Sequence, residues 1–304
     1  MLNFKKITLE DQEIMTPRLQ TLNCNLLNYS FAVQFLYRDI LNFEYAFSQD
    51  FMVIKSTMGG KEFFMLPVGE DDLEGILNEI KEDAFTKGNI LTFFQFCDEN
   101  AIKLLKWADE CVEKENLKYD FFPARDEFEY IYLSQQLISL EGHDLKSKRN
   151  HVNAFNKQYR WTSELITEKN LAEVTTFSET WNQEKEIPPC SKLNWENIAL
   201  KEAFKHYFEL KLQGLLIRVE EKVVAFAIGY PLNDDTYLVL FEKADYDYTG
   251  SYAMMNREFV KQFASHYLYV NRAEDAGVDG LRRAKLSYHP DYLSRVHYLE
   301  IRKN

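Results

Sequence analysis

Cysteine and histidine are scarce in this chain, and neither residue type is clustered. The 304 residues include six scattered histidines and four cysteines, which are Cys24, Cys97, Cys111 and Cys190. Thiols this few and this far apart argue against a disulfide framework and are typical of a reducing compartment. No group of His, Cys and acidic residues has the spacing of a zinc site. The sequence therefore predicts a cytoplasmic protein without a bound metal.

Long apolar runs and glycine-rich phosphate loops are also missing. No apolar run approaches the ~20 residues that a transmembrane helix needs, and the N-terminus has no apolar stretch typical of a signal peptide. We therefore expect no integral membrane insertion. Neither a Walker loop nor a Rossmann fingerprint occurs, and Ser251 lacks the second glycine of a nucleophile elbow. The common signatures of nucleotide-binding proteins and serine hydrolases are thus excluded.

Acidic charge and aromatic side chains, by contrast, are abundant. Asp and Glu outnumber Lys and Arg by 48 to 36, which gives a net charge of −12, and 15% of the residues are aromatic. A surface this acidic repels nucleic acid and anionic membranes unless a local basic patch intervenes. The aromatic residues can build a large core and suit a site lined with rings. We expect a small-molecule substrate as the partner, and the charge disfavours tRNA.

The hydrophobic periodicity predicts an α+β protein with a repeated architecture. Each half contains antiparallel strands followed by a helix, a strand, a helix and a strand, although no sequence repeat is visible. Such a mixture is typical of α+β or mixed-sheet folds. We place one domain at 1–140 and a second at 141–304, which includes the last strand at 295–301. Because no linker rich in Pro, Gly or Ser separates them, we expect tightly packed domains.

The stretch from Tyr267 to Pro290 reads as a short buried strand, a polar turn and a helix. Four polar residues follow the strand at once: Asn271, Arg272, Glu274 and Asp275. Asp279 is placed to cap the helix. Charge gathered where a strand ends and a helix begins indicates a candidate site, because rigid neighbours hold such loops. The alternative is a buried ion-pair network that fixes the last strand.

The helix within this stretch has a polar group on its inward face. Leu281, Ala284, Lys285 and Tyr288 fall at i, i+3, i+4 and i+7. A surface helix normally keeps that face apolar. A lysine and a tyrosine on it, with Arg282 close by in sequence, therefore suit either a site or a structural ion pair.

A basic helix predicted between 143 and 159 supplies a second candidate cluster. Its buried stripe consists of Leu145, Val152, Phe155 and Tyr159, and Arg149 and Asn153 lie on or beside that stripe. A guanidinium on an inward face suits a carboxylate or a phosphate. The alternatives are a solvated helix start, an internal ion pair of Arg149, and contact with an RNA backbone.

A third cluster joins a strand to a helix through a short loop. Glu242 lies near the end of the strand, Gly250, Ser251 and Tyr252 begin the helix, and Asn256 lies within it. This layout exposes backbone N–H groups at a helix start, where a cofactor anion can bind. The aspartates and tyrosines of the loop suit an amino-bearing ligand better. The structural alternatives are that Gly250 only relieves strain in a turn and that Asn256 is an ordinary polar surface residue.

Together the three clusters resemble soluble relatives of the C-terminal domain of phosphatidylglycerol lysyltransferase. The matching segments are residues 145–155, residues 241–245 with Tyr252 and Asn256, and residues 271–290. The resemblance covers nearly the whole chain. It implies two tandem folds of the GCN5-related N-acyltransferase type. Membrane-bound members of the family move an aminoacyl group from tRNA to a lipid head group, so the resemblance implies aminoacyl-tRNA, or acyl-CoA as in other relatives, as the donor.

We therefore predict an acyl or aminoacyl transferase that uses an amine or hydroxyl acceptor in a cleft between the two domains. The expected catalytic residues are Lys285, Glu242 and Tyr288, and Gly250 and Ser251 are expected to bind a cofactor. The predicted substrate-binding residues are Arg149, Asn153, Tyr252, Asn256, Asn271, Arg272, Glu274, Asp275 and Arg282. The alternatives are a non-catalytic binding module that retains the fold and an acetyl-CoA-dependent N-acetyltransferase.

Overall fold

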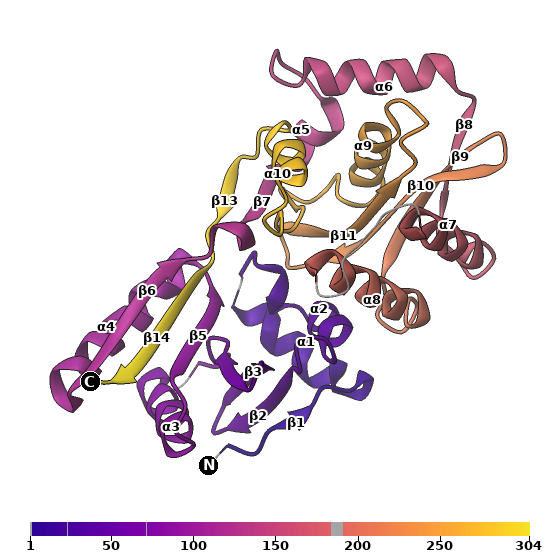
Figure 1. Cartoon of the computed structure of the whole chain (residues 1–304). Coiled ribbons are helices and arrows are strands. Elements are labelled where there is room, and N and C mark those ends of the chain that lie inside the picture. Colours follow the sequence, from indigo (N-terminus) through magenta and orange to yellow (C-terminus); the bar gives the residue numbers. More distant parts are fainter. Residues whose placement is uncertain (1, 23, 71, 184–190) are drawn as a thin grey trace. The chain divides into compact units, whose positions relative to one another are not determined.

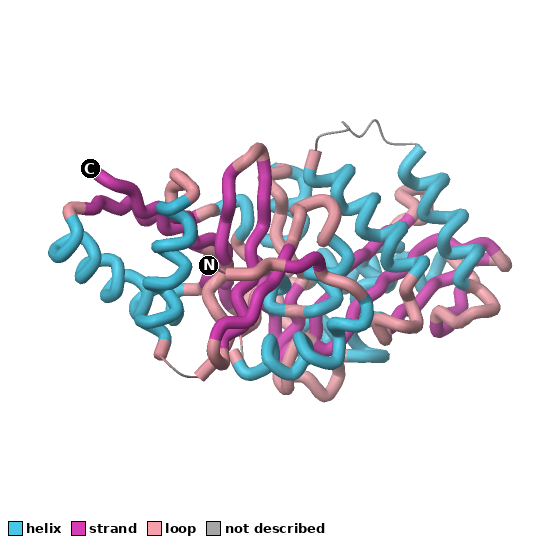
Figure 2. The backbone as a smooth tube through the Cα atoms, turned by 90° about the horizontal axis from the view of Figure 1, so that it is seen from below, coloured by secondary structure: helices cyan, strands magenta, loops and turns pink. Residues whose placement is uncertain are grey.

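The computed structural model describes residues 2–22, 24–70, 72–183 and 191–304, and divides into two compact units (Figure 1). The first unit comprises Met1–Phe128 and Ser294–Asn304, and the second comprises Glu129–Leu293. Cys190, one of the four cysteines, lies outside the described residues. Each unit is built on a seven-stranded sheet. The backbone trace in Figure 2 shows strands and helices by colour.

The first unit has the strand order β1-β2-β3-β4-β5-β14-β6. Its strands are β1 (Lys5–Lys6), β2 (Glu44–Ser48), β3 (Phe51–Met58), β4 (Lys61–Phe64), β5 (Leu91–Phe96), β6 (Leu117–Pro123) and β14 (His297–Lys303). Its α-helices are α1 (Gln12–Thr21), α2 (Phe31–Tyr37), α3 (Leu73–Thr86) and α4 (Asp98–Glu115). Neighbouring strands are antiparallel except β4 and β5, which run parallel.

The second unit has the strand order β13-β7-β12-β11-β10-β9-β8. Its strands are β7 (Glu129–Leu133), β8 (Trp161–Leu165), β9 (Gln213–Val219), β10 (Lys222–Pro231), β11 (Thr236–Ala244), β12 (Tyr269–Asn271) and β13 (Tyr292–Ser294). Its helices are α5 (Ser134–Ser139), α6 (Lys146–Gln158), α7 (Leu171–Gln183), α8 (Lys192–Lys205), α9 (Ser251–Phe263) and α10 (Asp279–Leu286). Here β11 and β12 form the parallel pair.

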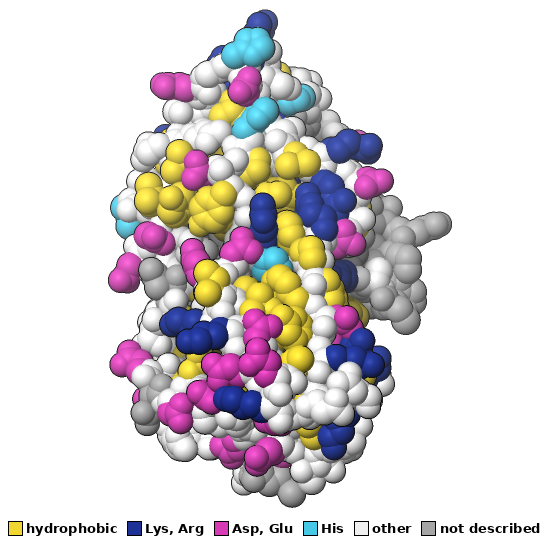
Figure 3. Space-filling model, turned by 90° about the vertical axis from the view of Figure 1, so that its left-hand side faces the viewer, with side chains coloured by type: hydrophobic (Ala, Val, Ile, Leu, Met, Phe, Trp, Pro, Cys, Tyr) yellow, Lys and Arg dark blue, Asp and Glu magenta, His cyan; other side chains and the backbone are white. Residues whose placement is uncertain are grey.

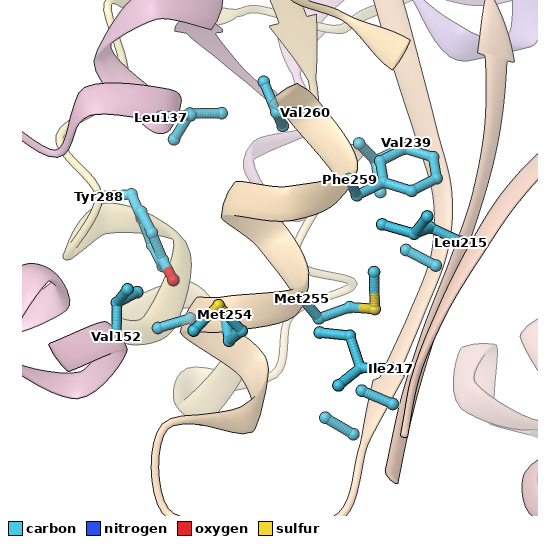
Figure 4. Close-up of a cluster of buried hydrophobic side chains, with 14 of the residues drawn as sticks. Leu137, Val152, Leu215, Ile217, Val239, Met254, Met255, Phe259, Val260 and Tyr288 are labelled. Atoms are coloured by element: carbon cyan, nitrogen blue, oxygen red, sulfur yellow. The ribbon is translucent and has the colours of Figure 1, made fainter. Parts of the chain in front are cut away.

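The core of the second unit lies between its sheet and α9. The helix contributes an apolar stripe that includes Met254, Met255, Phe259 and Val260, all of them at most 1% exposed. In Figure 4, Met255 and Phe259 lie beside Leu215, Ile217 and Val239 of the sheet, whereas Met254 and Val260 lie on the side of the helix toward Tyr288 and Leu137. Burial of one such side chain contributes about 1.5–3 kcal/mol relative to leaving it exposed. A rigid core thus lies directly beneath the elements that carry the polar clusters.

The two sheets confirm the duplication that the sequence pattern predicts. Both have four strands on one side of a parallel pair junction and three strands on the other, and in both a helix lies between the two parallel strands in sequence. One strand of each sheet comes from the other half of the sequence. β14, at the end of the chain, lies between β5 and β6, and β7 lies between β12 and β13.

This exchange of strands makes the compact units differ from the predicted division at 1–140 and 141–304. β7 and α5 belong to the second unit, and the last strand belongs to the first. The order of elements along a sequence indicates which strands exist, but not which sheet each strand joins, because pairing is decided by long-range packing.

The surface carries charges of both signs. On the face seen in Figure 3, Lys and Arg side chains and Asp and Glu side chains both lie among hydrophobic ones. Across the residues that the structure describes, none of the helices combines the length and apolar character needed to cross a membrane.

Candidate functional site

A fork between two parallel strands organises the polar clusters of the second unit. β11 and β12 pair only where Thr236, Tyr237 and Leu238 lie opposite Tyr269, Val270 and Asn271. β11 continues to Ala244, whereas β12 ends at Asn271, so the two strands separate beyond Leu238. Glu242 lies on the free part of β11, and Arg272 is the first residue after β12. The fork thus brings together two predicted site residues that are 30 positions apart.

An ion pair spans this fork. Nη2 of Arg272 donates to both carboxylate oxygens of Glu242, at 3.2 and 3.3 Å. The two side chains are 12% and 11% exposed. Burial works against the charged form of Arg272, but Glu242 raises its pKa above the ordinary value. From α9, Nδ2 of the buried Asn256 donates to Glu242 at 3.3 Å. Three residues predicted from two separate sequence clusters therefore form one network.

Two atoms of this network are buried without a hydrogen-bond partner among the described residues. They are Nη1 of Arg272 and Oδ1 of Asn256. An unsatisfied buried donor or acceptor costs about 1–3 kcal/mol, and more when it is charged. Such atoms are rare in folded proteins and call for a specific explanation.

Aromatic rings enclose the guanidinium. The Cζ atom of Arg272 lies 4.8 Å from the ring centre of Tyr288 and 5.7 Å from that of Tyr132. Both distances fit cation–π attraction. Burial raises the pKa of Tyr288 to about 12, so its hydroxyl stays protonated near neutral pH. Figure 4 shows Tyr288 beside Val152 of α6 and Met254 of α9.

Lys148 of α6 joins the cluster from its outer side. Its Nζ atom lies 4.2 Å from the ring centre of Tyr288. Burial lowers the pKa of Lys148, the nearby Arg272 lowers it further, and Glu242 opposes the change. The sequence-based site missed Lys148, although a usable signal exists. Positions 145, 148, 152 and 155 follow helical spacing, so Lys148 lies in the inward stripe of α6, whereas Arg149 lies beside it.

Lys285 supports the loop that carries Arg272. Its ammonium donates to the backbone carbonyls of Arg272, Ala273 and Glu274, at 2.5, 3.1 and 2.5 Å. An ammonium has three N–H donors, and all three are engaged. Burial lowers its pKa to about 8. Lys285, the predicted catalytic lysine, therefore holds the loop in place, and its catalytic role stays a prediction.

Asp275 anchors the other end of the same loop. Arg282 of α10 donates to both of its carboxylate oxygens at 2.8 Å, and the hydroxyl of Tyr130 donates at 2.5 Å. Burial raises the pKa of Asp275, but these two partners outweigh it and lower the value to about 2. Asp279, predicted to cap α10, is instead its first residue, and Val278 is the cap. The cap prediction was therefore wrong by one position.

Strand β7 supplies polar partners to the fork that the sequence-based site missed. Tyr130 and Tyr132 alternate with Ile131, so their side chains share one face of the strand. The hydroxyl of Tyr132 donates to the carbonyl of Lys285 at 2.8 Å. Nδ2 of Asn271 donates to Glu129 at 2.5 Å. No sequence signal links β7 to the fork, because the strand lies far upstream of it.

Several predicted residues lie elsewhere or have other partners. Nη1 of Arg149 donates to the carbonyls of Leu140 and Gly142, so it closes the turn before α6. Asn153 is exposed, and Glu274 contributes its backbone carbonyl to Lys285. Among the described residues, neither Arg149 nor Asn153 forms a hydrogen bond or an ion pair with Arg272 or Glu242. Their assignment to a substrate therefore stays a prediction.

The start of α9 is explained by close packing against α6. Gly250 has φ +90°, and a Cβ there would lie 2.3 Å from the carbonyl oxygen of His151. The hydroxyl of Ser251 donates to the carbonyl of Asp245 at 2.8 Å. Burial raises the pKa of the half-buried Tyr252 well above its ordinary value. A cofactor at Gly250 and Ser251 thus stays a prediction, because packing alone accounts for the glycine.

A metal centre is not supported within the described parts of the chain. None of the His, Cys, Asp and Glu side chains there form a group of three that could hold a metal ion.

Comparison with known proteins places the chain in a family. Residues 22–299 match the family described as phosphatidylglycerol lysyltransferase, C-terminal, and the chain belongs to that family. A conserved protein of unknown function from Bacteroides thetaiotaomicron VPI-5482 is 32% identical, with a TM-score of 0.90 and 100% of both chains covered. An uncharacterized protein of Mycoplasmoides gallisepticum is 27% identical over 177 residues, which cover 57% of this chain and 56% of that relative.

More distant solved structures confirm the fold. The L-PGS of Bacillus licheniformis has a TM-score of 0.67 at 18% identity, with 99% of this chain and 93% of that chain covered. A tandem protein of the GCN5-related type from the clavulanic acid biosynthesis pathway has a TM-score of 0.51 at 8% identity, with 98% of each chain covered. The chain has the predicted α+β architecture of two tandem GCN5-related N-acyltransferase-like folds, and its fold is transferase-like.

Proposed function

We propose that the chain transfers an acyl or aminoacyl group to an amine or hydroxyl acceptor at the fork of the second unit. The observation that carries this proposal is the network at the fork. A buried acid, a buried arginine and an amide meet there and leave one donor atom and one acceptor atom unpartnered. Membership in the lysyltransferase family supports the same class of reaction.

The network offers what such a transfer needs. An attacking amine must lose a proton, and the carbonyl oxygen of the donor gains negative charge in the transition state. In the proposed mechanism Glu242 holds the amine and takes its proton. The guanidinium of Arg272 and the hydroxyl of Tyr288 stabilise the oxyanion. The new bond forms between the amine nitrogen and the carbonyl carbon, the bond from that carbon to the leaving oxygen or sulfur breaks, and the leaving group takes up a proton.

The remaining residues act through position. Lys285 and Asp275 hold the two ends of the loop that carries Arg272. Asn256 fixes the carboxylate of Glu242 and offers its free oxygen to an N–H of the substrate. Positioning of reacting groups can supply a large part of a rate enhancement, so we treat these three as positioning residues.

The first test is a panel of thermal-unfolding measurements on the purified chain. The panel contains CoA, acetyl-CoA, aminoacyl-nucleosides that mimic charged tRNA ends, and free amino acids. A ligand at ~100 times its dissociation constant stabilises a protein by about 2.7 kcal/mol. Stabilisation by aminoacyl-nucleosides supports the proposal, and stabilisation by CoA compounds alone favours an acetyltransferase. If none of these compounds stabilises the chain, the result favours a non-catalytic binding module.

The second test measures transfer directly by mass spectrometry with the ligand that stabilises the chain. We expect Glu242→Gln to abolish transfer. The matched control is Glu173→Gln, which removes a carboxylate from an exposed pair with Arg218 in the same unit. Equal transfer by both variants would remove Glu242 from the mechanism.

A further inference from the structure

We infer that Lys148 and Arg272 together bind an anionic group, a phosphate or a carboxylate, that the substrate of the fork carries. The inference rests on the proposed function only in assigning that anion to a substrate. The evidence for the anion site itself is the balance of charge, the direction of the donors, and the way that both cations share one ring.

The cluster has more positive than negative charge. Arg272 and Lys148 are both cationic, whereas Glu242 is the one carboxylate that pairs with Arg272 among the described residues. Asp275, the next acid along the loop, is already bound by Arg282 on both oxygens. Lys148 has no ion pair with any described residue. One positive charge is therefore left over at a half-buried position.

The donors of Arg272 point in two directions. Nη2 is engaged by Glu242, and Nη1, with its two N–H donors, is buried and unpartnered within the described chain. A guanidinium is planar, and the spacing of its N–H donors matches the oxygens of a carboxylate or a phosphate. The pair with Glu242 therefore fixes the plane of the guanidinium and leaves Nη1 as the binding edge.

Lys148 lies against the same ring of Tyr288 as that guanidinium, and the charge of Arg272 acts on it. Its ammonium lies 4.2 Å from the ring centre, and the guanidinium lies 4.8 Å from the same centre. Each cation is attracted to the ring, but the two repel each other. An anion bound by both cations would offset that repulsion with two attractions. Because Lys148 is half-buried and at the outer side, its side chain can move to admit the anion.

The surrounding groups define what the ligand carries beside its anion. Oδ1 of Asn256 and the carboxylate of Glu242 are both acceptors. The site therefore suits a molecule in which a phosphate or carboxylate lies near an amine or a hydroxyl. This is the chemistry of an amino acid with a free carboxylate, or of an acceptor that bears a phosphate beside a hydroxyl.

Titration calorimetry at low ionic strength tests the site with inorganic phosphate and with acetate as separate probes, against chloride as the reference. The proteins are the wild-type chain, Lys148→Met, Lys148→Arg, and the control Lys146→Met, which removes an exposed lysine from the same helix. We expect one anion to bind the wild type, and Lys148→Met to weaken binding about tenfold or more. Lys148→Arg and Lys146→Met should retain it.

The two probes distinguish the sources of the anion. Tighter binding of phosphate indicates a phosphate-bearing substrate, and tighter binding of acetate indicates a free carboxylate. Binding of neither anion, or equal binding by Lys148→Met and the wild type, would overturn the inference. Because no donor is present, the result is independent of transfer. Anion binding without any transfer would contradict the proposed function alone, and transfer without anion binding would contradict the anion site alone.

Discussion

The same fork occurs in both units, but different side chains meet there. In the first unit β4 and β5 pair in parallel at Phe64 and Phe93. Gln34 of α2 is fully buried and donates to the sulfur of Met65, the residue after β4, at 3.0 Å. At the matching place in the second unit, Glu242 and Arg272 form an ion pair. The two sheets thus have the same arrangement of strands but different side chains at the fork.

The residue that follows the second parallel strand in sequence shows the contrast most simply. In the second unit it is Arg272, with an unpartnered buried donor. In the first unit it is Cys97, which caps α4 and accepts a hydrogen bond from Cys24 of the same unit. Buried side-chain atoms without a hydrogen-bond partner among the described residues occur in both units, such as Oε1 of Gln34 in the first and Nη1 of Arg272 in the second, but Gln34 is neutral and Arg272 is charged. This difference in charge is the reason why we propose the transfer chemistry for the second unit.

The largest expected effect is on stability when the second fork loses its arginine. Arg272→Met leaves Glu242 buried and unpaired, which should lower the free energy of unfolding by about 3–5 kcal/mol. Gln34→Leu in the first fork should cost about 1–3 kcal/mol, because it leaves a backbone carbonyl without its donor. Urea unfolding measures both. An equal loss in the two variants would remove the energetic difference between the forks.

A second contrast concerns glycines with positive φ in the two units. Gly250→Ala should destabilise the chain by about 3 kcal/mol, because it combines left-handed strain with a clash against the His151 carbonyl. Gly59→Ala, in the hairpin of the first unit, meets nothing within 4 Å and should cost about 1 kcal/mol. Thermal unfolding compares the two variants. A mild effect at Gly250 would show that α6 shifts easily from α9.

Removal of Lys285 should weaken the loop that carries Arg272. Lys285→Met leaves three carbonyls without their donor and should cost about 1–3 kcal/mol. It should also reduce phosphate or acetate binding at Lys148. The matched variant is Lys81→Met, which removes the buried lysine that pairs with Glu115 in the first unit. That variant should leave anion binding unchanged, and reduced binding there would contradict a role confined to Lys285.

Lys285 should also make the stability of the folded chain depend on pH, and the sign of this dependence follows from its pKa. Burial lowers the pKa of Lys285 from the ordinary 10.5 to about 8 in the folded chain. Between these values the unfolded chain binds the proton and the folded chain has released it, so stability rises with pH. The wild type should therefore gain stability relative to Lys285→Met from pH 8 to 10.5, with no change below pH 8. A constant difference across this range would contradict the lowered pKa.

The smallest expected effect is on the reactivity of Cys97 at the first fork. This side chain should react as a thiolate near neutral pH. The hydrogen bond from Cys24 lowers the pKa of Cys97 to about 7. Burial raises the pKa of Cys111. Alkylation followed by mass spectrometry should show a rate at Cys97 that rises with a midpoint near pH 7, absent in Cys97→Ser. A midpoint near 9 would show that the two thiols do not interact.

Local patterns in the sequence predict much of this structure. Gly59 and Gly60 between two strand-like runs indicate a hairpin, and the structure pairs Met58 with Lys61. The polar residues after Tyr267 predict either a site or a buried ion-pair network, and the structure pairs Arg272 with Glu242. In both cases neighbouring residues carry the signal, because turn geometry and helical spacing are local properties.

What the sequence does not predict depends on pairing over long distances. Tyr132 reaches the fork because β7 joins the second sheet beside β12, and the last strand returns to the first sheet. The difference between Arg149 and Lys148 is instead a matter of one position on α6. The hydrophobic stripe places Lys148 inward, but a charged residue within a stripe is easily taken for a surface one.

The account rests on the claim that the second fork, and not the first, receives the substrate. The direct measurement is calorimetric binding of an aminoacyl-adenosine with a stable amide linkage to the wild type, Glu242→Gln and Gln34→Leu. We predict binding by the wild type and by Gln34→Leu, and its loss in Glu242→Gln. Retained affinity in Glu242→Gln, with loss in Gln34→Leu, would place the ligand at the first fork and contradict the account.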